Sequence, residues 1–311
     1  MKTSIVCVAL TVALAAGTAG PERAEETGVA TSSVTSVPWG LQGHEMAARA
    51  AYRSLPPSLP AFFRDAGEQL VYLNPEPDRW RDDAFAEMNE AMRYDHYIDL
   101  ENVPEVARAA RDRFVFLSML YGAGQLEKPE RDAGFLPFRI VEVYQRLVSE
   151  WRLWRAETDP RRRAWIEQRI VNDAGILGHY VTDGSQPHHT TIHFDGWAAG
   201  APNPQGYTDE RGFHARFEGA YVAVHVTQSH VDARMADPRS VAGSARRAVW
   251  SYLLETFAEV EELYRLDRDV GFDPFDSPDA EALDFTADRL AAGASMLATL
   301  WLSAWEESAG P

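Results

Sequence analysis

Apolar residues recur with a helical period through most of the chain. In residues 160–183 the apolar side chains follow one another at steps of four, four, three and four positions, at Ile166, Ile170, Ala174, Leu177 and Val181. This spacing places them on one face of an α-helix. Similar helical text occupies 43–55, 135–156, 213–235, 240–266 and the segment from 279 towards the C-terminus. Because Asn-Gly dipeptides are absent and alternating β-branched runs are few, the pattern predicts an all-α fold.

The N-terminal residues differ in composition from this helical text. Residues 1–19 combine one lysine, a short apolar run and small residues at the end, which is typical of a secretory signal peptide cut after Ala19. Residues 20–38 are polar and rich in Thr and Ser, which indicates a propeptide or linker. We therefore expect one all-helical domain over residues 39–311. The mature chain should be secreted or periplasmic and monomeric, with no transmembrane segment.

Cysteine content and charge narrow the chemistry. The single cysteine, Cys7, lies within the predicted signal peptide, so the mature chain would have no thiol. A transition metal would then be held by His, Asp, Glu and backbone groups. The net charge of −17 repels polyanions at long range, which argues against a protein that binds duplexes tightly. Cationic metals in a cleft could still attract phosphate locally.

Metal-capable side chains gather in LGHYVTDGSQPHHTTIHFDGW, residues 177–197. His179 and Asp183 are four positions apart near the end of a predicted helix, so they share one face. The helix should stop at the Gly and Pro that follow, since proline cannot continue it. The chain can then turn back and bring His188 or His189 beside the helix end. The spacing predicts a metal site here.

A second pair with the same spacing, His214 and Glu218, follows the loop 184–212. A single such pair on a helix is ordinarily a surface ion pair. Two pairs that bracket a His-rich loop, in a chain without a mature cysteine, favour metal binding. A loop of this length inside a compact domain is typically functional or disordered. Three aromatic residues favour an ordered loop that covers a site: Phe194, Trp197 and Tyr207.

Further candidates lie nearer the N-terminus. His44 begins a predicted helix five residues after Trp39, where a lone histidine is ordinarily a cap or a surface group. The segment 76–101 is rich in acids that would ordinarily be solvated. Its candidate residues are Asp78, Asp82, Asp83, Asp95, His96 and Asp99.

These residues resemble the motif of the superfamily of zinc-dependent phospholipases C and single-strand-specific nucleases. In that motif a His is followed by Asp at +4, by His at +10 after Gln-Pro, and later by a His and an acid four apart. The chain matches it with His179, Asp183, Gln186, Pro187, His189, His214 and Glu218. The resemblance runs from Trp39 to Glu218. It implies an all-helical phosphodiesterase that carries three zinc ions.

The resemblance also implies a ligand set and site roles. One zinc would be held by Asp78, His96, His179 and Asp183, a second by His189, His214 and Glu218, and a third by Trp39, His44 and the bridging Asp183. Asp183 would hold two metal ions around a shared water, and Asp78 is also a candidate general base. Tyr97 and Asp99 of the HYID block are the expected substrate contacts. His188 and His193 would serve the loop or support the ligands.

Two points of the match stay open. Asp78 fits the Pro-Asp and Asp-x-x-Arg patterns best, whereas the spacing of Asp82 to His96 is like that of some phospholipases; we choose Asp78. In the family the ligand Trp is the N-terminal residue of the mature chain. Trp39 follows Pro38, so this ligand would require a second cut after Pro38.

The sequence leaves the substrate divided between two phosphoesters. Glu218 resembles the phospholipases, whereas the short Trp39-to-His44 spacing and the HYID block resemble the nucleases. The acidic surface disfavours a processive nucleic-acid enzyme but permits short single strands that stack on Tyr97 or Trp197. We therefore favour a phospholipase C acting on a choline-type phospholipid, with a single-strand-specific nuclease or 3′-nucleotidase as the alternative.

Two other classes of protein are alternatives to a phosphodiesterase. The segment DDAFAE, residues 82–87, superficially resembles the magnesium motif of helical terpene synthases, but those proteins lack the histidine array. A secreted helical binding protein with purely structural metal is the nearer of these two alternatives, and it stays a remote alternative to the phosphodiesterases.

Overall fold

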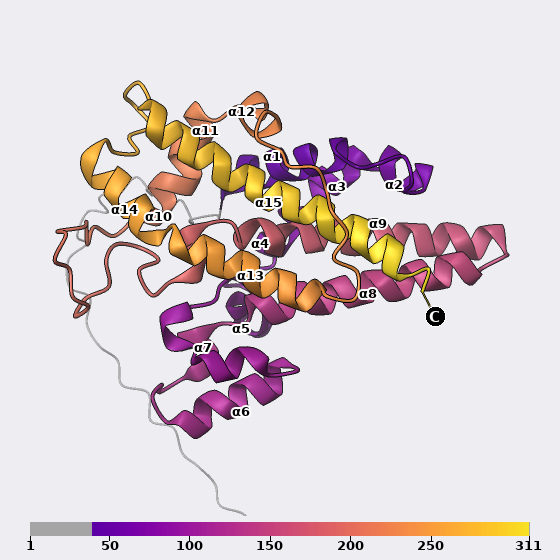
Figure 1. Cartoon of the computed structure of the whole chain (residues 1–311), viewed down its shortest axis with the longest axis horizontal. Coiled ribbons are helices and arrows are strands. Elements are labelled where there is room, and N and C mark those ends of the chain that lie inside the picture. Colours follow the sequence, from indigo (N-terminus) through magenta and orange to yellow (C-terminus); the bar gives the residue numbers. More distant parts are fainter. Residues whose placement is uncertain (1–38, 311) are drawn as a thin grey trace, which may run out of the picture. The chain divides into compact units, whose positions relative to one another are not determined.

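Helix α15 (Ala280–Glu307) packs against α1 (Gly40–Arg53), α8 (Leu136–Ala156) and α9 (Pro160–Asp183), and lies across the middle of the helices in Figure 1. The computed structural model describes residues 39–310, and most of these residues are helical. Within that range the extended pairing amounts to two isolated β-bridges. The predicted all-α class is therefore confirmed.

Helices α8 and α9 form a hairpin joined by three residues, and their bounds follow the predicted segments closely. Asp159 caps α9, since its side chain accepts hydrogen bonds of 2.9 Å from the backbone N–H groups of Arg161 and Arg162. The helix ends at Asp183, immediately before Gly184, as the sequence predicts. This exact ending matters because the last turn carries two site residues.

Large aromatic side chains fill the core between these helices. Phe63 of α2 (Ala61–Asp65) lies edge-on to Trp301 at 5.6 Å and to Trp151 at 5.5 Å between ring centroids, and all three are fully buried. Each such pair adds about 0.5–1.5 kcal/mol to the stabilisation from burial alone. The indole N–H of Trp301 donates to the carbonyl of Ala174 at 3.1 Å, which ties α15 to α9.

Two glycines of α9 allow α3 (Gly67–Leu73) to lie unusually close to it. A Cβ at Gly175 would lie 2.3 Å from the Cβ of Leu73, and a Cβ at Gly178 would lie 2.5 Å from the side-chain nitrogen of Asn74. Only glycine fits such an approach. The close packing brings Asn74, which follows α3, into the buried interior beside His44.

The shorter elements lie between and after these long helices. Before α8 they are α4 (Glu76–Arg79), α5 (Ala86–Met92), the 3₁₀ helices η1 (Arg93–His96), η2 (Leu100–Asn102) and η3 (Glu105–Ala109), α6 (Arg113–Ala123) and α7 (Pro129–Ala133). After α9 they are the 3₁₀ helix η4 (Pro187–Thr190), α10 (Phe213–Ala215), the π-helix η5 (Arg216–Tyr221), α11 (Val222–His225), α12 (Gln228–Asp232), α13 (Ala245–Ala258) and α14 (Val260–Asp269).

Two long stretches of helical period are divided in the structure. The stretch 213–235 breaks after His225, where Val226 is extended and Thr227 caps α12. The stretch 240–266 divides at Glu259 into α13 and α14. Apolar period alone does not locate such breaks, because both sides of each break keep an apolar face toward the same core.

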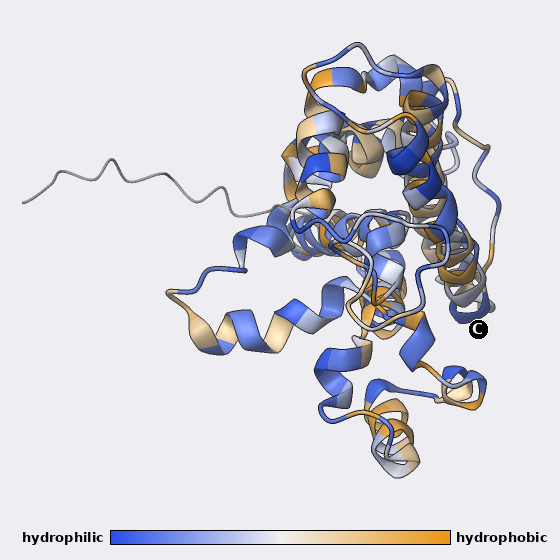
Figure 2. Ribbon diagram, turned by 90° about the vertical axis from the view of Figure 1, so that its left-hand side faces the viewer, coloured by the Kyte–Doolittle hydropathy of each residue, from blue (hydrophilic) through white to orange (hydrophobic). Residues whose placement is uncertain are grey.

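Hydrophilic and hydrophobic residues alternate along the helices in Figure 2. In residues 39–310 none of the helices combines the length and apolar character needed to cross a membrane. The predicted signal peptide, residues 1–19, and the predicted propeptide or linker, residues 20–38, lie outside the described residues.

Candidate metal centre

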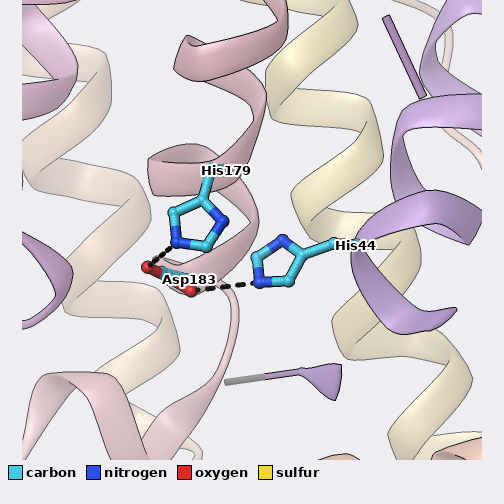
Figure 3. Close-up of side chains that lie close together, drawn as sticks. All are labelled: His44, His179 and Asp183. Carbon is cyan, nitrogen blue, oxygen red and sulfur yellow. Dashed lines mark ion pairs between the residues drawn. The ribbon is translucent and has the colours of Figure 1, made fainter. Parts of the chain in front are cut away.

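The last turn of α9 is the meeting point of the candidate ligands. His179 and Asp183 lie one turn apart on this helix and are fully buried. His44 of α1 approaches from the other side, so that the two histidines flank the Asp183 carboxylate, as Figure 3 shows. Their rings stack at 4.2 Å between centroids. Asp78 of α4 and His96 of η1 complete the surroundings of the helix end.

Ligand atoms of four side chains lie close together at the end of α9. Nδ1 of His96 lies 3.0 Å from Nε2 of His179, 3.0 Å from Oδ2 of Asp183 and 3.8 Å from Oδ1 of Asp78. Nε2 of His179 lies 3.3 Å from that Asp183 oxygen and 3.6 Å from that Asp78 oxygen. A tetrahedron of ligands at zinc distances has edges of about 3.3–3.4 Å. The five distances bracket this value. Asp78, His96 and His179 form one group that could hold a metal ion, and Asp183 contacts two of them; we call these four residues the four-residue set.

The second oxygen of Asp183 faces a different group. Its Oδ1 lies 3.4 Å from Nε2 of His44 and 3.8 Å from Nδ1 of His189. One carboxylate therefore directs Oδ2 toward His96 and His179 and Oδ1 toward His44. This is the arrangement that a bridging carboxylate requires.

A separate set of three ligand atoms comes from η4, α10 and the π-helix η5. Nε2 of His189 lies 3.2 Å from Nε2 of His214 and 3.6 Å from Oε2 of Glu218. The latter two atoms are 2.8 Å apart. His214 keeps 17% of its side chain exposed, whereas Glu218 is fully buried. Three protein ligands with one accessible side are typical of catalytic rather than structural zinc sites.

Hydrogen bonds to two backbone carbonyls and one side-chain amide fix the orientation of three rings. Nδ1 of His189 donates to the carbonyl of His96 at 2.6 Å, and Nδ1 of His214 donates to the carbonyl of Phe194 at 2.8 Å. Nδ1 of His44 donates to Oδ1 of Asn74 at 2.9 Å. Because the Nδ1 atoms of His214 and His44 are occupied by these bonds, Nε2 of each ring, which faces a carboxylate, is the atom that would bind a metal.

Gln186 orients the remaining carboxylate. Its side-chain nitrogen donates to Oε2 of Glu218 at 2.9 Å, and its oxygen accepts from the backbone N–H of His188 at 2.7 Å. The same residue therefore ties the turn after α9 to the π-helix. π-Helical turns occur frequently at functional sites.

Several buried ligand atoms lack a hydrogen-bond partner among the described residues. They include Nε2 of His44, both carboxylate oxygens of Asp78, Oδ1 of Asp183 and Oε1 of Glu218. A buried polar atom without a partner costs about 1–3 kcal/mol. Metal coordination would satisfy these atoms, so the residues fit a group of bound cations.

Opposing charges set the pKa values of the buried carboxylates. Burial raises the pKa of Asp183, but the charges of His179 and His189 outweigh it and hold that pKa well below its usual range. Burial likewise raises the pKa of Glu218, and His214 with His189 bring it far below the ordinary value. Both side chains are therefore ionised at neutral pH, which is the state that binds metal.

The pKa values of two buried histidines shift in opposite directions. Burial lowers the pKa of His96 to about 4, despite the neighbouring Asp183. For His189 burial also lowers the pKa, but Asp183 and Glu218 outweigh it and raise the value to about 9. A pKa of about 4 keeps the His96 ring neutral and able to donate a lone pair at neutral pH. A cation bound beside His189 would compete with its proton.

The two expected substrate contacts lie at the edge of this centre. Asp99 is buried, and burial together with the charges of Glu101 and Asp132 raises its pKa well above the ordinary value. The hydroxyl of Tyr97 donates to the carbonyl of Arg131, so this side chain is held by the protein itself.

Two further candidates, Asp82 and Trp197, make contacts with other parts of the protein. Asp82 is exposed, and its carboxylate accepts from the backbone N–H of Ala84, so the structure brings Asp78 and not Asp82 to the centre. The Trp197 ring stacks on His193 at 3.7 Å and lies edge-on to Tyr264 at 5.1 Å. One face of Trp197 is therefore occupied by the protein and is not available to a base.

Trp39 and His188 are buried beside the centre. Trp39 has a φ of 43°, and its indole N–H donates to the carbonyl of Thr182 at 2.9 Å, one residue before Asp183. His188 stacks on His214 at 5.1 Å and meets the ring of Phe213 edge-on. Both residues thus support ligand-bearing segments.

Sequence reasoning did not single out Asn74 as a site residue, and it used Gln186 only as part of a motif. The signal for Gln186 is its place between two ligand-bearing elements. For Asn74 a signal exists in the Gly175 and Gly178 pair on the opposing helix, which indicates close approach. The partner of that approach becomes visible only in the folded chain.

Comparison with known proteins gives one informative similarity. No family model matches the chain, and no solved structure matches it. Among curated proteins, a probable serine protease of Bradyrhizobium tropiciagri is 26% identical over 209 residues. The match covers 57% of this chain and 24% of that protein, so the chain spans about a quarter of the relative's length.

Proposed function

We propose that the chain is a metal-dependent hydrolase of phosphoric esters, with the fold of the phospholipase C and nuclease superfamily that its motif resembles. The observation that carries the proposal is the convergence of the four-residue set, Asp78, His96, His179 and Asp183, at the end of α9. It shares Asp183 with His44 and lies beside a second, more open set of three ligands. This arrangement suits a cluster of ions better than an isolated structural ion.

Zinc fits the chemistry of these residues, since each set mixes neutral imidazoles with carboxylates. The three ions expected from the resemblance would be held by the four-residue set, by His189 with His214 and Glu218, and by His44 with Asp183 and Trp39. When bound, zinc would supply positive charge for a phosphoryl group and lower the pKa of water.

The protein's own groups would hold and orient this chemistry. Asp183 fixes the spacing of two ligand sets, because its two oxygens face different histidines. The partly exposed His214 marks the side from which a phosphoester can approach. Asp78, whose carboxylate oxygens have no hydrogen-bond partner among the described residues, could accept a proton as a general base.

The preference for one phosphoester substrate over the other rests on the sequence motifs. Glu218 favours a phospholipase C acting on a choline-type lipid, and we keep that preference. Phe194 does not distinguish the two esters: this side chain is 48% exposed, and its carbonyl accepts a hydrogen bond from the His214 ring. An exposed aromatic ring beside an open ligand set could contact either a lipid chain or a base. A single-strand-specific nuclease or 3′-nucleotidase is therefore the second candidate.

The name of the curated relative raises serine proteolysis as a competing hydrolytic activity. A serine protease needs a serine hydroxyl bonded to a general base such as histidine. Between residues 39 and 310 no serine hydroxyl hydrogen-bonds to a histidine ring; Ser185, the serine nearest the centre in sequence, donates to the carbonyl of Thr182 at 2.8 Å. The match covers 24% of that protein, so its name does not decide the activity of this chain.

Metal content and a substrate panel test the proposal together. Elemental analysis of the purified protein should find zinc near three equivalents, and a sub-stoichiometric trace would overturn the proposal. The panel consists of phosphatidylcholine, single-stranded DNA, single-stranded RNA, a nucleoside 3′-monophosphate and a casein control. Release of a phosphoester product that stops on chelation and returns with zinc is expected. Casein cleavage that survives chelation would favour the protease alternative.

The same preparation tests two subsidiary expectations. Mass measurement of the secreted N-terminus should find a chain that begins at Trp39, whereas a start at Gly20 would remove its amino group from the ligand set. If chelation unfolds a protein that turns over no phosphoester, the metal is structural and the binding-protein alternative holds.

A further inference from the structure

The far end of the α8–α9 hairpin carries positive charge in an otherwise acidic chain. Residues 146–169 contain seven arginines and four acids, a net charge of +3, whereas the whole chain has a net charge of −17. The turn between α8 and α9 lies at the extreme right of Figure 1, beside the end of α15. Arg163 and His179 are sixteen residues apart on α9, which is about 24 Å along a helix. This region is therefore separate from the candidate metal centre.

A surface pocket lies at this end of the hairpin. Its lining includes Arg152, Trp154, Arg155, Arg163 and Ser308, and no carboxylate side chain takes part in it. We call it the arginine pocket.

Two of the three guanidinium groups are held by aromatic rings. The guanidinium carbon of Arg155 lies 3.3 Å from the centroid of the Trp305 ring, and that of Arg163 lies 3.8 Å from the centroid of Trp154. Arg155 also donates to the hydroxyl of Ser308 and to the carbonyl of Trp305, both at 2.8 Å. Stacking on a ring fixes a guanidinium without neutralising it.

The charge of the arginine pocket is uncompensated within the described residues. No carboxylate oxygen of residues 39–310 lies within 4.0 Å of the guanidinium groups of Arg152, Arg155 or Arg163. By contrast, Arg146 and Arg169 on the same hairpin are paired with Asp173 and Glu150. The nearest acid that contacts the lining, Glu167, accepts the indole N–H of Trp154 at 2.9 Å.

We propose that the arginine pocket binds a phosphate-bearing anion. Two stacked guanidinium groups and a third, exposed one line the same pocket, and the planar guanidinium group can bind two phosphate oxygens at once. The ordering cost of binding is small because stacking already holds two of the groups. The bound phosphate could be free in solution or belong to a lipid headgroup. The proposal is independent of the chemistry at the metal centre.

Calorimetric titration of the full chain with inorganic phosphate tests the proposal. Arg152→Glu reverses a pocket charge on an exposed side chain without a hydrogen bond or ion pair in the described residues, so the fold should persist. Phosphate binding should weaken about tenfold or more, since a hydrogen bond to a charged group contributes about 1.5–3 kcal/mol. Arg247→Glu makes the same charge change on α13, outside the pocket, and should stay within about twofold of the unchanged chain.

A third variant tests the stacking directly. Arg163→Lys keeps the charge but loses the planar group over Trp154, and a several-fold weakening is expected. Phosphate bound at the metal centre is common to all variants and does not change the comparison. Equal affinity in Arg152→Glu and Arg247→Glu, or no phosphate binding by the folded unchanged chain, would overturn the proposal.

Vesicles identify the source of the phosphate. Phosphatidylcholine vesicles are compared with vesicles that also contain phosphatidic acid, whose phosphate is a monoester. If the unchanged chain sediments with phosphatidic acid and Arg152→Glu does not, the pocket binds a lipid headgroup. If neither sediments while Arg152 still governs binding of free phosphate, the pocket binds a soluble phosphate.

Discussion

The two ends of α9 handle charge in opposite ways. At the C-terminal end, buried carboxylates such as Asp183 are surrounded by histidines that arrive from α1, η1 and η4. At the N-terminal end, arginines such as Arg163 stay at the surface without carboxylate partners. The difference shows that a buried charge requires opposing groups from several elements, whereas a surface charge can stay uncompensated and free to bind a ligand.

The pKa values of two buried carboxyl groups show how much the surrounding charges matter. Asp183 is the last residue of α9, and Glu150 of α8 pairs with Arg169 of α9. Asp183 and Glu150 are both buried. The pKa of Asp183 falls well below its usual range, because His179 and His189 outweigh the effect of burial. The pKa of Glu150 rises to about 7, since burial dominates and the charge of Asp173 adds to it. Burial alone therefore favours the neutral acid, and only the converging histidines make a buried metal ligand.

The largest expected effect follows from changing Asp183 to Asn. The amide keeps the size but loses the charge that two ligand sets share, so both should lose metal. We expect phosphoester hydrolysis to fall about a thousandfold, the scale of several kcal/mol of lost charge stabilisation. Elemental analysis and kcat/KM on the substrate that the panel identifies provide the measurement.

Asp173→Asn is the matched control for this change. Asp173 is a buried aspartate on the same helix, but it pairs with Arg146 and lies ten residues from Asp183. This variant should keep its metal and its hydrolytic activity. Full metal content in Asp183→Asn would show that the helix end is not a metal site.

A smaller effect is expected from Gln186→Met. Methionine has a similar size but cannot donate to Glu218 or accept from the backbone of His188. Loss of a hydrogen bond that orients a ligand typically lowers metal affinity or activity by about 10–100-fold. Competition with a chromophoric chelator gives the affinity.

Gln145→Met controls for the substitution itself, because Gln145 is exposed on α8. It should leave metal affinity unchanged. If Gln186→Met binds zinc as tightly as the unchanged chain, the Gln186 side chain only stabilises the turn, and thermal unfolding rather than metal affinity should change.

The sequence predicts the C-terminal end of α9 well, because the residues that mark it lie close together along the chain. The i,i+4 spacing of His179 and Asp183 and the proline after the helix are fixed by helix geometry, and the structure ends α9 at Asp183. The partners from distant elements are a different matter. His44 could be proposed only through resemblance to a family, since nothing local distinguishes it from a helix cap.

The support around the ligands could not be derived from the sequence. Asn74 reaches His44 because two glycines of α9 admit α3, a relation between segments about a hundred residues apart. The breaks after His225 and at Glu259 were also missed, because the apolar period continues across them. Tertiary packing decides both kinds of feature, and a single sequence does not record it.

The smallest expected effect concerns Glu150. Its pKa is about 7 when folded and near the ordinary 4.5 when unfolded, so between these values the folded chain holds a proton that the unfolded chain has lost. The free energy of unfolding should therefore fall as pH rises from about 4.5 to 7, and the full penalty should remain above pH 7. Glu150→Gln removes the penalty, which should stabilise the chain at pH 8 but not at pH 4.

We expect a gain of about 1–2 kcal/mol at pH 8, less than the full shift implies because Arg169 and nearby solvent screen the charge. Urea unfolding of both chains at pH 5, 6, 7 and 8 measures it, and taking differences at each pH cancels the contribution of the metal centre. Glu255→Gln, an exposed glutamate on α13, should follow the unchanged chain at every pH. If Glu150→Gln is instead less stable at pH 8, the ion pair with Arg169 outweighs burial. In that case the positive charge of Arg169 stabilises the buried Glu150 carboxylate, in the same way that the histidines stabilise the buried Asp183 carboxylate.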